Sequence, residues 1–325
     1  KTGLVGVAIA TLIATMVTGY FYYQVVRTYV PWFGMERPLP GAIRHFLGLS
    51  SWFLVWNLVS QLMRASDVVI LGVFASAELV TTYTLTKYVP ETVIMVVEIM
   101  VLGIAPGLGG IIGSGDYSKA LKIRNELMSY SWLLITIIGS AVLIWNRSFT
   151  QLWVGSQHYA GAQQTLLIML SVLQLVLIRN DANFIDLTLK MRDKVLVGLF
   201  STLISLGIAT LFVHTFNGGI TGLCLGLIIG RAILSFAYPW LIGRYLGVEL
   251  GQQLRHVVVP LVVLIVIFTG SSIASEYWVV DSWIKLVGAV GLTVIVVTPL
   301  TVFGGLTGEQ RSLMWQRVKL LLVRS

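Results

Sequence analysis

The chain has 325 residues, of which 56% are apolar and only 11% are charged. Because soluble domains carry about 25% charged residues, this composition excludes a soluble enzyme. The high apolar content also excludes a disordered chain. A polytopic membrane protein remains. In such a protein the net charge of +8 indicates basic cytoplasmic loops rather than nucleic-acid binding.

Nine apolar stretches are long enough to cross a bilayer as helices, which requires about 20 residues each. They lack the residue alternation that is typical of a membrane β-barrel. The predicted fold is therefore an all-α bundle of about nine transmembrane helices. In chain order the stretches are 3–26, 46–75, 80–105, 127–146, 160–182, 195–214, 219–241, 256–274 and 283–304.

The segments that join these helices are alternately rich and poor in basic residues. Counted from 27–45, the odd-numbered segments hold fifteen of the 22 Lys and Arg residues, whereas the even-numbered segments hold only Arg147. By the positive-inside rule, the odd-numbered segments and the C-terminus are cytoplasmic. The N-terminus then lies outside without a signal peptide, so we expect that further helices precede this chain.

The second predicted helix contains two charged residues, Arg64 and Asp67. Ionisable residues at the centre of a membrane cost at least about 2.5–3.5 kcal/mol each, and they usually face a cavity or a partner. Arg64 and Asp67 lie three residues apart and share one face of the helix. Two interpretations stay open: a local ion pair, or a polar cavity in which Arg64 contacts an anion.

The third predicted helix carries Lys87, Glu91 and Glu98 on one stripe, with Pro90 between the first two. Proline removes a backbone donor and can kink a helix. Lys87 and Glu91 either extend to the outer interface or line a water-filled path, and Glu98 lies deeper. We therefore take Lys87 as a candidate for substrate binding. Glu91, Glu98 and Asp67 are candidates for coupling to a proton or sodium ion.

Two further arginines lie in the fifth and seventh predicted helices. Arg179 and Asp181 belong to a polar cluster at the inner end of the fifth, part of which must be a plain loop. Arg231 lies in the middle of the seventh with no acid near it in sequence. Its partner is Glu98, Asp67 or an anionic ligand. Arg179 and Arg231 join the substrate-binding candidates, and Asp181 joins the ion-coupling candidates.

No pattern for a metal, a cofactor or hydrolytic catalysis is visible. The single cysteine, Cys224, excludes an internal disulfide and a Cys-based metal site. The four histidines form no HxxxH or HExxH pattern, and no GxxxxGK[ST] phosphate loop occurs. We therefore expect no metal, no cofactor and no enzymatic activity.

Short motifs follow one another between Leu47 and Gly247. They are Ser50-Ser-Trp-Phe53, Asp67-Val-Val-Ile-Leu-Gly72-Val-Phe74, Ala77-Glu-Leu-Val-Thr-Thr-Tyr83, Ile104-Ala-Pro106, Gly115-Asp-Tyr-Ser-Lys-Ala120, Trp145-Asn146, Leu152-Trp-Val-Gly155 and Tyr159. Their order and spacing resemble the polysaccharide-transporter branch of the multidrug/oligosaccharidyl-lipid/polysaccharide exporter superfamily, the Wzx-like flippases. Thr82 departs from this pattern, since the family commonly has glycine there.

The resemblance implies a MATE-like fold of two six-helix lobes and two further helices. Residues 1–45 would be the last helix of the first lobe and a linker, and 46–247 the second lobe. Residues 248–305 would be the extra helix pair. Independently of the resemblance, the helical spacing of apolar residues among arginines in 306–325 predicts a basic amphipathic tail that anchors on the inner leaflet rather than binding a partner.

The function implied is export of a lipid-linked oligosaccharide across the bacterial cytoplasmic (inner) membrane. The substrate would be an undecaprenyl-pyrophosphate-linked repeat unit of O-antigen, capsule or exopolysaccharide. Membrane lipids and a polysaccharide polymerase machinery are the expected partners. Three alternatives are a cation-coupled multidrug exporter of the same fold, a membrane-embedded glycosyltransferase or polymerase, and a non-catalytic scaffold. The glycosyltransferase would need a large external loop, which the sequence lacks, and the scaffold leaves the buried charges unexplained.

Overall fold

The computed structural model describes residues 2–30, 33–34 and 40–324, so part of the predicted segment 27–45 lies outside it. Within this part of the chain all regular structure is helical, and nine helices are long and apolar enough to cross a membrane. The predicted all-α polytopic class is therefore confirmed. The helices are α1 (Thr2–Tyr29), α2 (Pro40–Phe74), α3 (Ala77–Gly113), α4 (Tyr117–Trp153), η1 (Ser156–His158), α5 (Ala162–Leu187), α6 (Met191–His214), α7 (Gly219–Leu246), α8 (Leu250–Tyr277), α9 (Trp283–Gly305) and α10 (Gly308–Arg324).

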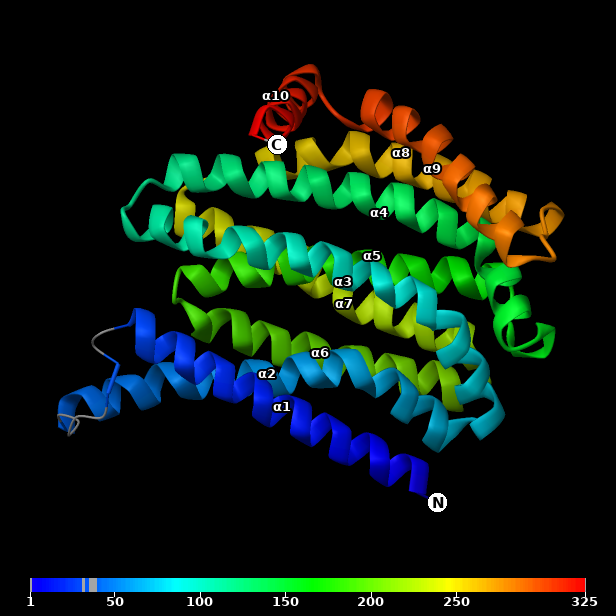
Figure 1. Ribbon diagram of the computed structural model, residues 1–325, viewed down its shortest axis with the longest axis horizontal. Coiled ribbons are helices and arrows are strands. Elements are labelled where there is room, and N and C mark those ends of the chain that lie inside the picture. Colours follow the sequence, from blue (N-terminus) through cyan, green and yellow to red (C-terminus); the bar gives the residue numbers. More distant parts are fainter. Residues whose placement is uncertain (1, 31–32, 35–39, 325) are drawn as a thin grey trace. The chain divides into compact units, whose positions relative to one another are not determined.

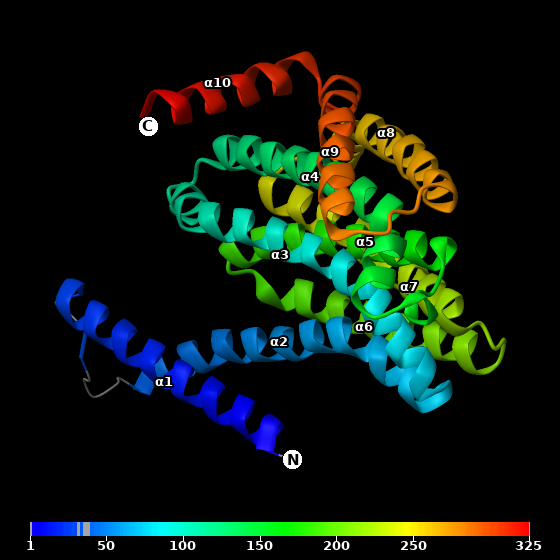
Figure 2. The same cartoon turned by 45° about the vertical axis from the view of Figure 1, so that its right-hand side comes forward.

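The chain divides into two compact units, Lys1–Gly48 and Leu49–Ser325. The first unit contains α1, a 28-residue apolar helix without an acidic residue in its first turn. The second unit contains the helices that carry the charged residues of interest. Within it, α7 packs against α5 and α6, while α4 packs against α8 and α9. Figures 1 and 2 both show α8 and α9 alongside α4, away from α6.

Polar side chains fix where several helices begin. Ser76 accepts a hydrogen bond from the backbone N–H of Leu79 (3.2 Å) and starts α3. Asp116 does the same for α4 through the N–H of Lys119 (3.0 Å). Such caps satisfy backbone donors that have no partner within the helix. The C-terminal end of α7 is marked by Gly247, whose φ of 73° is a left-handed conformation that favours glycine.

Glycines on α7 allow an unusually close approach to α6. A Cβ added to Gly226 would overlap the backbone of Ala209, and one added to Gly230 would overlap the backbone of Ser205. The hydroxyl of Ser205 donates to the carbonyl of Ser201, so it is satisfied within its own helix. Small residues at an interface let membrane helices pack backbone to backbone, where van der Waals contact is the main attraction.

Two charged residues that were predicted to lie in cytoplasmic loops, Arg124 and Lys194, instead lie in helices. The segment 106–126 was expected to be a cytoplasmic loop, but α3 extends to Gly113 and α4 begins at Tyr117. Arg124 is consequently a buried helix residue. Lys194, expected in the next cytoplasmic loop, lies in α6 and is fully buried, paired with Asp186 and 3.8 Å from the centre of the Trp56 ring. Charged residues lower the local hydropathy, so these segments were predicted to be loops. A helix can nevertheless continue past an apolar run when its charged side chains are paired with others inside the bundle.

Candidate ligand-binding site

A charged cavity of about 210 Å³ lies among α2, α3, α5 and α7. It brings together seven of the eight residues that the sequence analysis selected as binding or coupling candidates. They are Arg64, Asp67, Lys87, Glu91, Glu98, Arg179 and Arg231. Their formal charges sum to +1. Ionisable side chains from four helices therefore meet in one small cavity inside the bundle.

Helix α3 provides the longest wall of this cavity. Tyr83, Lys87, Glu91 and Glu98 all line it. Their spacings of four and seven residues place them on one helix face. From Tyr83 to Glu98 the wall extends for about 22 Å along the helix axis. The predicted charged stripe of α3 thus faces a cavity.

Asp67 is the centre of a hydrogen-bonded group between α2 and α3. The Tyr83 hydroxyl donates to Asp67 Oδ2 (2.6 Å), and Lys87 Nζ lies 2.5 Å from the same oxygen. The other oxygen, Oδ1, accepts from the backbone N–H of Val68 (2.8 Å). Lys87 Nζ also lies 2.7 Å from Glu91 Oε1. Both oxygens of Asp67 are therefore satisfied, and the ion pair that its spacing to Arg64 allowed does not form.

The two arginines on α5 and α7 have different partners. Arg179 forms an ion pair with Glu98 and so joins α5 to α3. Arg231 donates to the Met63 carbonyl (2.5 Å) and to Ser171 Oγ (3.1 Å), which joins α7 to α2 and α5. No carboxylate of the described residues lies within ion-pair distance of Arg231, although the charge of Asp67 still attracts it. Its buried charge is thus held by neutral oxygens alone.

Arg64 has neither a hydrogen bond nor an ion pair with any residue that the structure describes, and it is only half-buried. Arg64 and Arg179 line the same cavity, and their two positive charges repel each other. Two like charges in a low-dielectric region repel unless an anion lies near both. Among the described residues, Arg64 and Arg231 are therefore the two cations of this cavity that form no ion pair with a carboxylate.

Asp181 is the one selected residue that lies elsewhere. Its Oδ1 accepts from Arg124 Nε (2.9 Å) and Nη2 (2.6 Å), in a second cavity between α4, α5, α7 and α8. Sequence reasoning missed Arg124 because it was counted as a loop residue. Its helical spacing to Ala120 and Leu127, both buried, was the available signal.

Two further residues at the charged cavity were also missed. Tyr83 lies one turn before Lys87, and Ser171 lies on the cavity side of α5. Neither residue is ionised, so a search for buried charges passes over both. Among the described residues, no group of three His, Cys, Asp or Glu side chains is arranged to hold a metal ion.

Comparisons with protein-family models, with curated proteins and with solved structures gave no match to this chain.

Proposed function

We propose that this multi-pass membrane protein is an exporter that binds an anionic group of its substrate in the charged cavity. The observation that carries the proposal is Arg64, which has no partner among the described residues in a cavity whose formal charge is +1. A guanidinium group offers a planar fork of donors that matches phosphate oxygens. An anion placed between Arg64 and Arg179 would neutralise their repulsion. Alternating access around this site would then move the substrate across the membrane.

The substrate class that fits best is a lipid-linked oligosaccharide with a pyrophosphate linkage. Its phosphates supply the anionic group, and its lipid keeps the molecule in the bilayer beside the bundle. The motifs between Leu47 and Gly247 that resemble the Wzx-like flippases support this class and a bacterial cytoplasmic membrane. With that substrate, a polysaccharide polymerase would act on the exported repeat unit.

A cation-coupled multidrug exporter is the second candidate, and the three carboxylates of the cavity favour it. A cationic drug needs a free acid, however, and Asp67 is only 3% exposed and already bonded to Tyr83 and Lys87. Glu98 is paired with Arg179. Glu91, whose side chain is 50% exposed, is the most accessible of the three carboxylates, and it is paired with Lys87. The arginines are therefore the better guide to the substrate.

The test uses the full chain reconstituted in lipid vesicles, with undecaprenyl pyrophosphate as the probe. Arg64→Gln removes one positive charge without breaking a hydrogen bond or ion pair to any residue that the structure describes. Since hydrogen bonds to charged groups contribute about 1.5–3 kcal/mol, the variant should bind the probe about tenfold to a hundredfold more weakly. Arg244→Gln is the matched control, because Arg244 is exposed at the end of α7 and outside the cavity.

Transport is measured in cells that depend on this protein for polysaccharide export. Lipid-linked repeat units should accumulate on the cytoplasmic side when Arg64 or Arg231 is replaced, but not with the Arg244 control. Arg231→Lys separates charge from geometry, because lysine keeps the charge and loses the fork. Unchanged probe binding and export after removal of Arg64, Arg179 and Arg231 together, in a protein that still inserts, would refute the proposal. Binding of organic cations in place of the probe would favour the drug exporter.

A further inference from the structure

A second and larger cavity, of about 350 Å³, lies between α4, α5, α7 and α8. It shares no lining residue with the charged cavity. Its volume falls in the range of about 300–1,000 Å³ that is typical of small-molecule sites. Nothing in the proposed function uses it.

The lining residues show that this cavity is a slot parallel to the helices. It extends along α4 from Arg124 to Trp132 and along α8 from Gln253 to Leu261. The first and last residues of each stretch are eight positions apart, or about 12 Å at the rise of an α-helix. On α8 the lining residues follow one another every fourth position through Val257, as expected for a single helix face.

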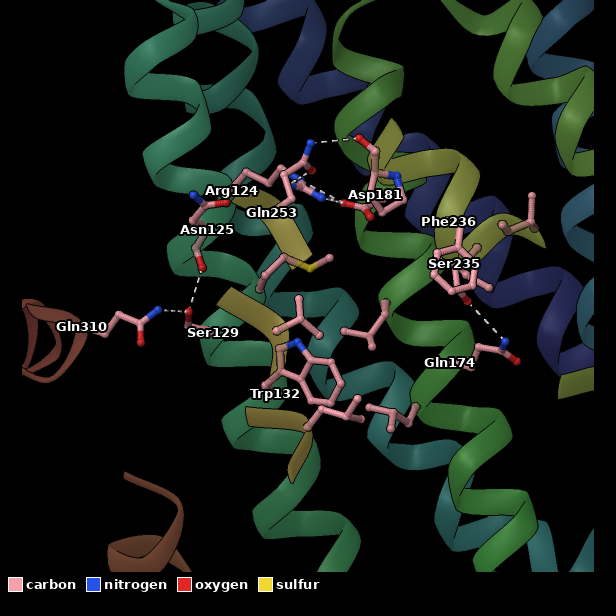
Figure 3. Close-up of a pocket in the computed structure, with 18 residues that line it drawn as sticks. Arg124, Asn125, Ser129, Trp132, Gln174, Asp181, Ser235, Phe236, Gln253 and Gln310 are labelled. Atoms are coloured by element: carbon pink, nitrogen blue, oxygen red, sulfur yellow. Dashed lines mark hydrogen bonds and ion pairs between the residues drawn. The ribbon is translucent and has the colours of Figure 1, made fainter. Parts of the chain in front are cut away.

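The two ends of the slot differ in chemistry. Arg124, Gln253 and Asp181 gather at one end, whereas Trp132 lies toward the other (Figure 3). Between the ends the walls are mostly apolar, and they include Met128, Leu177, Val257 and Leu261, while Ser129, Gln174 and Ser235 add uncharged polar groups. The slot is therefore lined mainly by hydrocarbon, and its charged residues lie at one end.

The polar end carries no net charge, because its arginine is already neutralised. Arg124 directs Nε and Nη2 to Asp181 Oδ1 and Nη1 to Gln253 Oε1 (3.0 Å). The side-chain amide of Asn125, beside Arg124, makes no hydrogen bond to any described residue. An uncharged acceptor of a ligand would satisfy this amide. A second anion would have to compete with Asp181 for Arg124.

We propose that the slot binds one acyl chain of a membrane lipid, with the ester carbonyl near Asn125 and the chain along Val257 and Leu261. The medium around a transmembrane bundle is hydrocarbon, so a chain that enters an apolar space loses no favourable solvation. A lipid chain lies roughly parallel to transmembrane helices, as the slot does. The charged headgroup of the lipid stays outside, which agrees with the neutral polar end.

The tail helix α10 adds a wall near that polar end. Gln310 Nε2 donates to Ser129 Oγ (2.7 Å), and both side chains line the slot. Figure 3 shows Gln310 reaching Ser129 from the side, below Arg124. The contact joins α10 to α4 beside the place where the ester group would lie.

The test is photolabelling of the full chain in phosphatidylcholine vesicles. The probe is a phosphatidylcholine with a diazirine in one acyl chain, and labelled peptides are mapped by mass spectrometry. Adducts are expected on Met128, Leu177 and Val257, in addition to those on lipid-facing residues such as Val258, which is 56% exposed. Val257→Trp fills the slot and should lower adducts on Met128 and Leu177 at least tenfold. Val258→Trp is the matched control and should leave them unchanged.

Three results would overturn the proposal. The first is wild-type labelling confined to exposed residues, and the second is slot labelling that Val257→Trp does not change. The third is labelling of the slot by a diazirine fatty acid but not by the phospholipid, which would assign the site to free fatty acids. If Val257→Trp does not fold, Leu261→Phe fills the same slot more gently. None of these readouts depends on transport, so the fate of the proposed export function does not affect them.

Discussion

Lys87 Nζ lies 2.5 Å from Asp67 Oδ2, and this ion pair joins α3 to α2 at the charged cavity. Asp67 is buried, and its other contacts come from Tyr83 and from its own backbone neighbour Val68. Lys87 also reaches Glu91. A buried pair of this kind stabilises little by itself, but removal of one partner leaves a buried charge without compensation.

Asp67→Ala should therefore lower the free energy of unfolding by about 3–5 kcal/mol, because Lys87 then keeps only the half-exposed Glu91. Replacing Asp67 and Lys87 together by leucine should recover a large part of this loss. The measurement is unfolding in detergent, analysed as a double-mutant cycle. The pair Lys285–Asp281, which is exposed at the start of α9, is the control and should show no measurable coupling. Additive effects of Asp67 and Lys87 would contradict the prediction.

The ion pair of Arg124 with Asp181 should be needed to hold α8 against α4 and α5. Arg124→Ala leaves Asp181 buried without a cation and also frees Gln253, whose amide donates to the Pro239 carbonyl (3.1 Å). We expect a loss of about 3–5 kcal/mol and faster hydrogen exchange of the α8 backbone around Gln253. Arg244→Ala, in an exposed pair with a separation of 3.9 Å, should change neither quantity. Exchange in α8 that stays at the wild-type rate would argue against this role.

The contact of α6 with α7 should not tolerate a side chain at Gly230. Gly230→Val would force its Cβ into the backbone of Ser205, so the helices must separate. Overpacking of this kind costs typically about 1–3 kcal/mol, to be measured by thermal unfolding in detergent. Gly207→Ala on α6 is the control, since its Cβ would meet no atom within 4 Å. Because alanine favours a helix over glycine, Gly207→Ala should be neutral or stabilising by up to about 1 kcal/mol.

Tyr159, in the loop between α4 and α5, should titrate at a higher pH than a free tyrosine. Burial raises the pKa of its hydroxyl above the ordinary value, while the charge of Arg147 acts in the opposite direction. Since the folded pKa is raised, the stabilisation is fully present below the unfolded pKa and is lost as the pH rises through the folded pKa. Tyr159→Phe should therefore make the protein less sensitive to alkaline unfolding.

The measurement for Tyr159 is the ultraviolet absorbance titration of wild type minus Tyr159→Phe. Arg147→Ala should move the midpoint of this difference to still higher pH, because it removes a positive charge that favours the phenolate. A midpoint at or below the ordinary tyrosine value of about 10 would contradict the burial argument.

The membrane class and the positions of the helices follow from the sequence because they depend on local hydrophobicity. Nine apolar runs were predicted, and nine helices in the described part of the chain are suited to a bilayer. The ends of these helices were less accurate. Arg124 and Lys194 were predicted to be loop residues, because composition alone does not show whether a charge will be paired inside a bundle.

The sequence also selected the residues of the charged cavity, because a charge inside an apolar run stands out without any knowledge of the fold. Which charges meet was decided only by the tertiary structure. Arg64 and Asp67 share a helix face, yet Asp67 bonds to Tyr83 and Lys87 on α3. Asp181 was grouped with Glu98 but lies in another cavity. Pairing depends on how helices far apart in the chain are rotated and packed, and the spacing of residues along one helix does not contain that information.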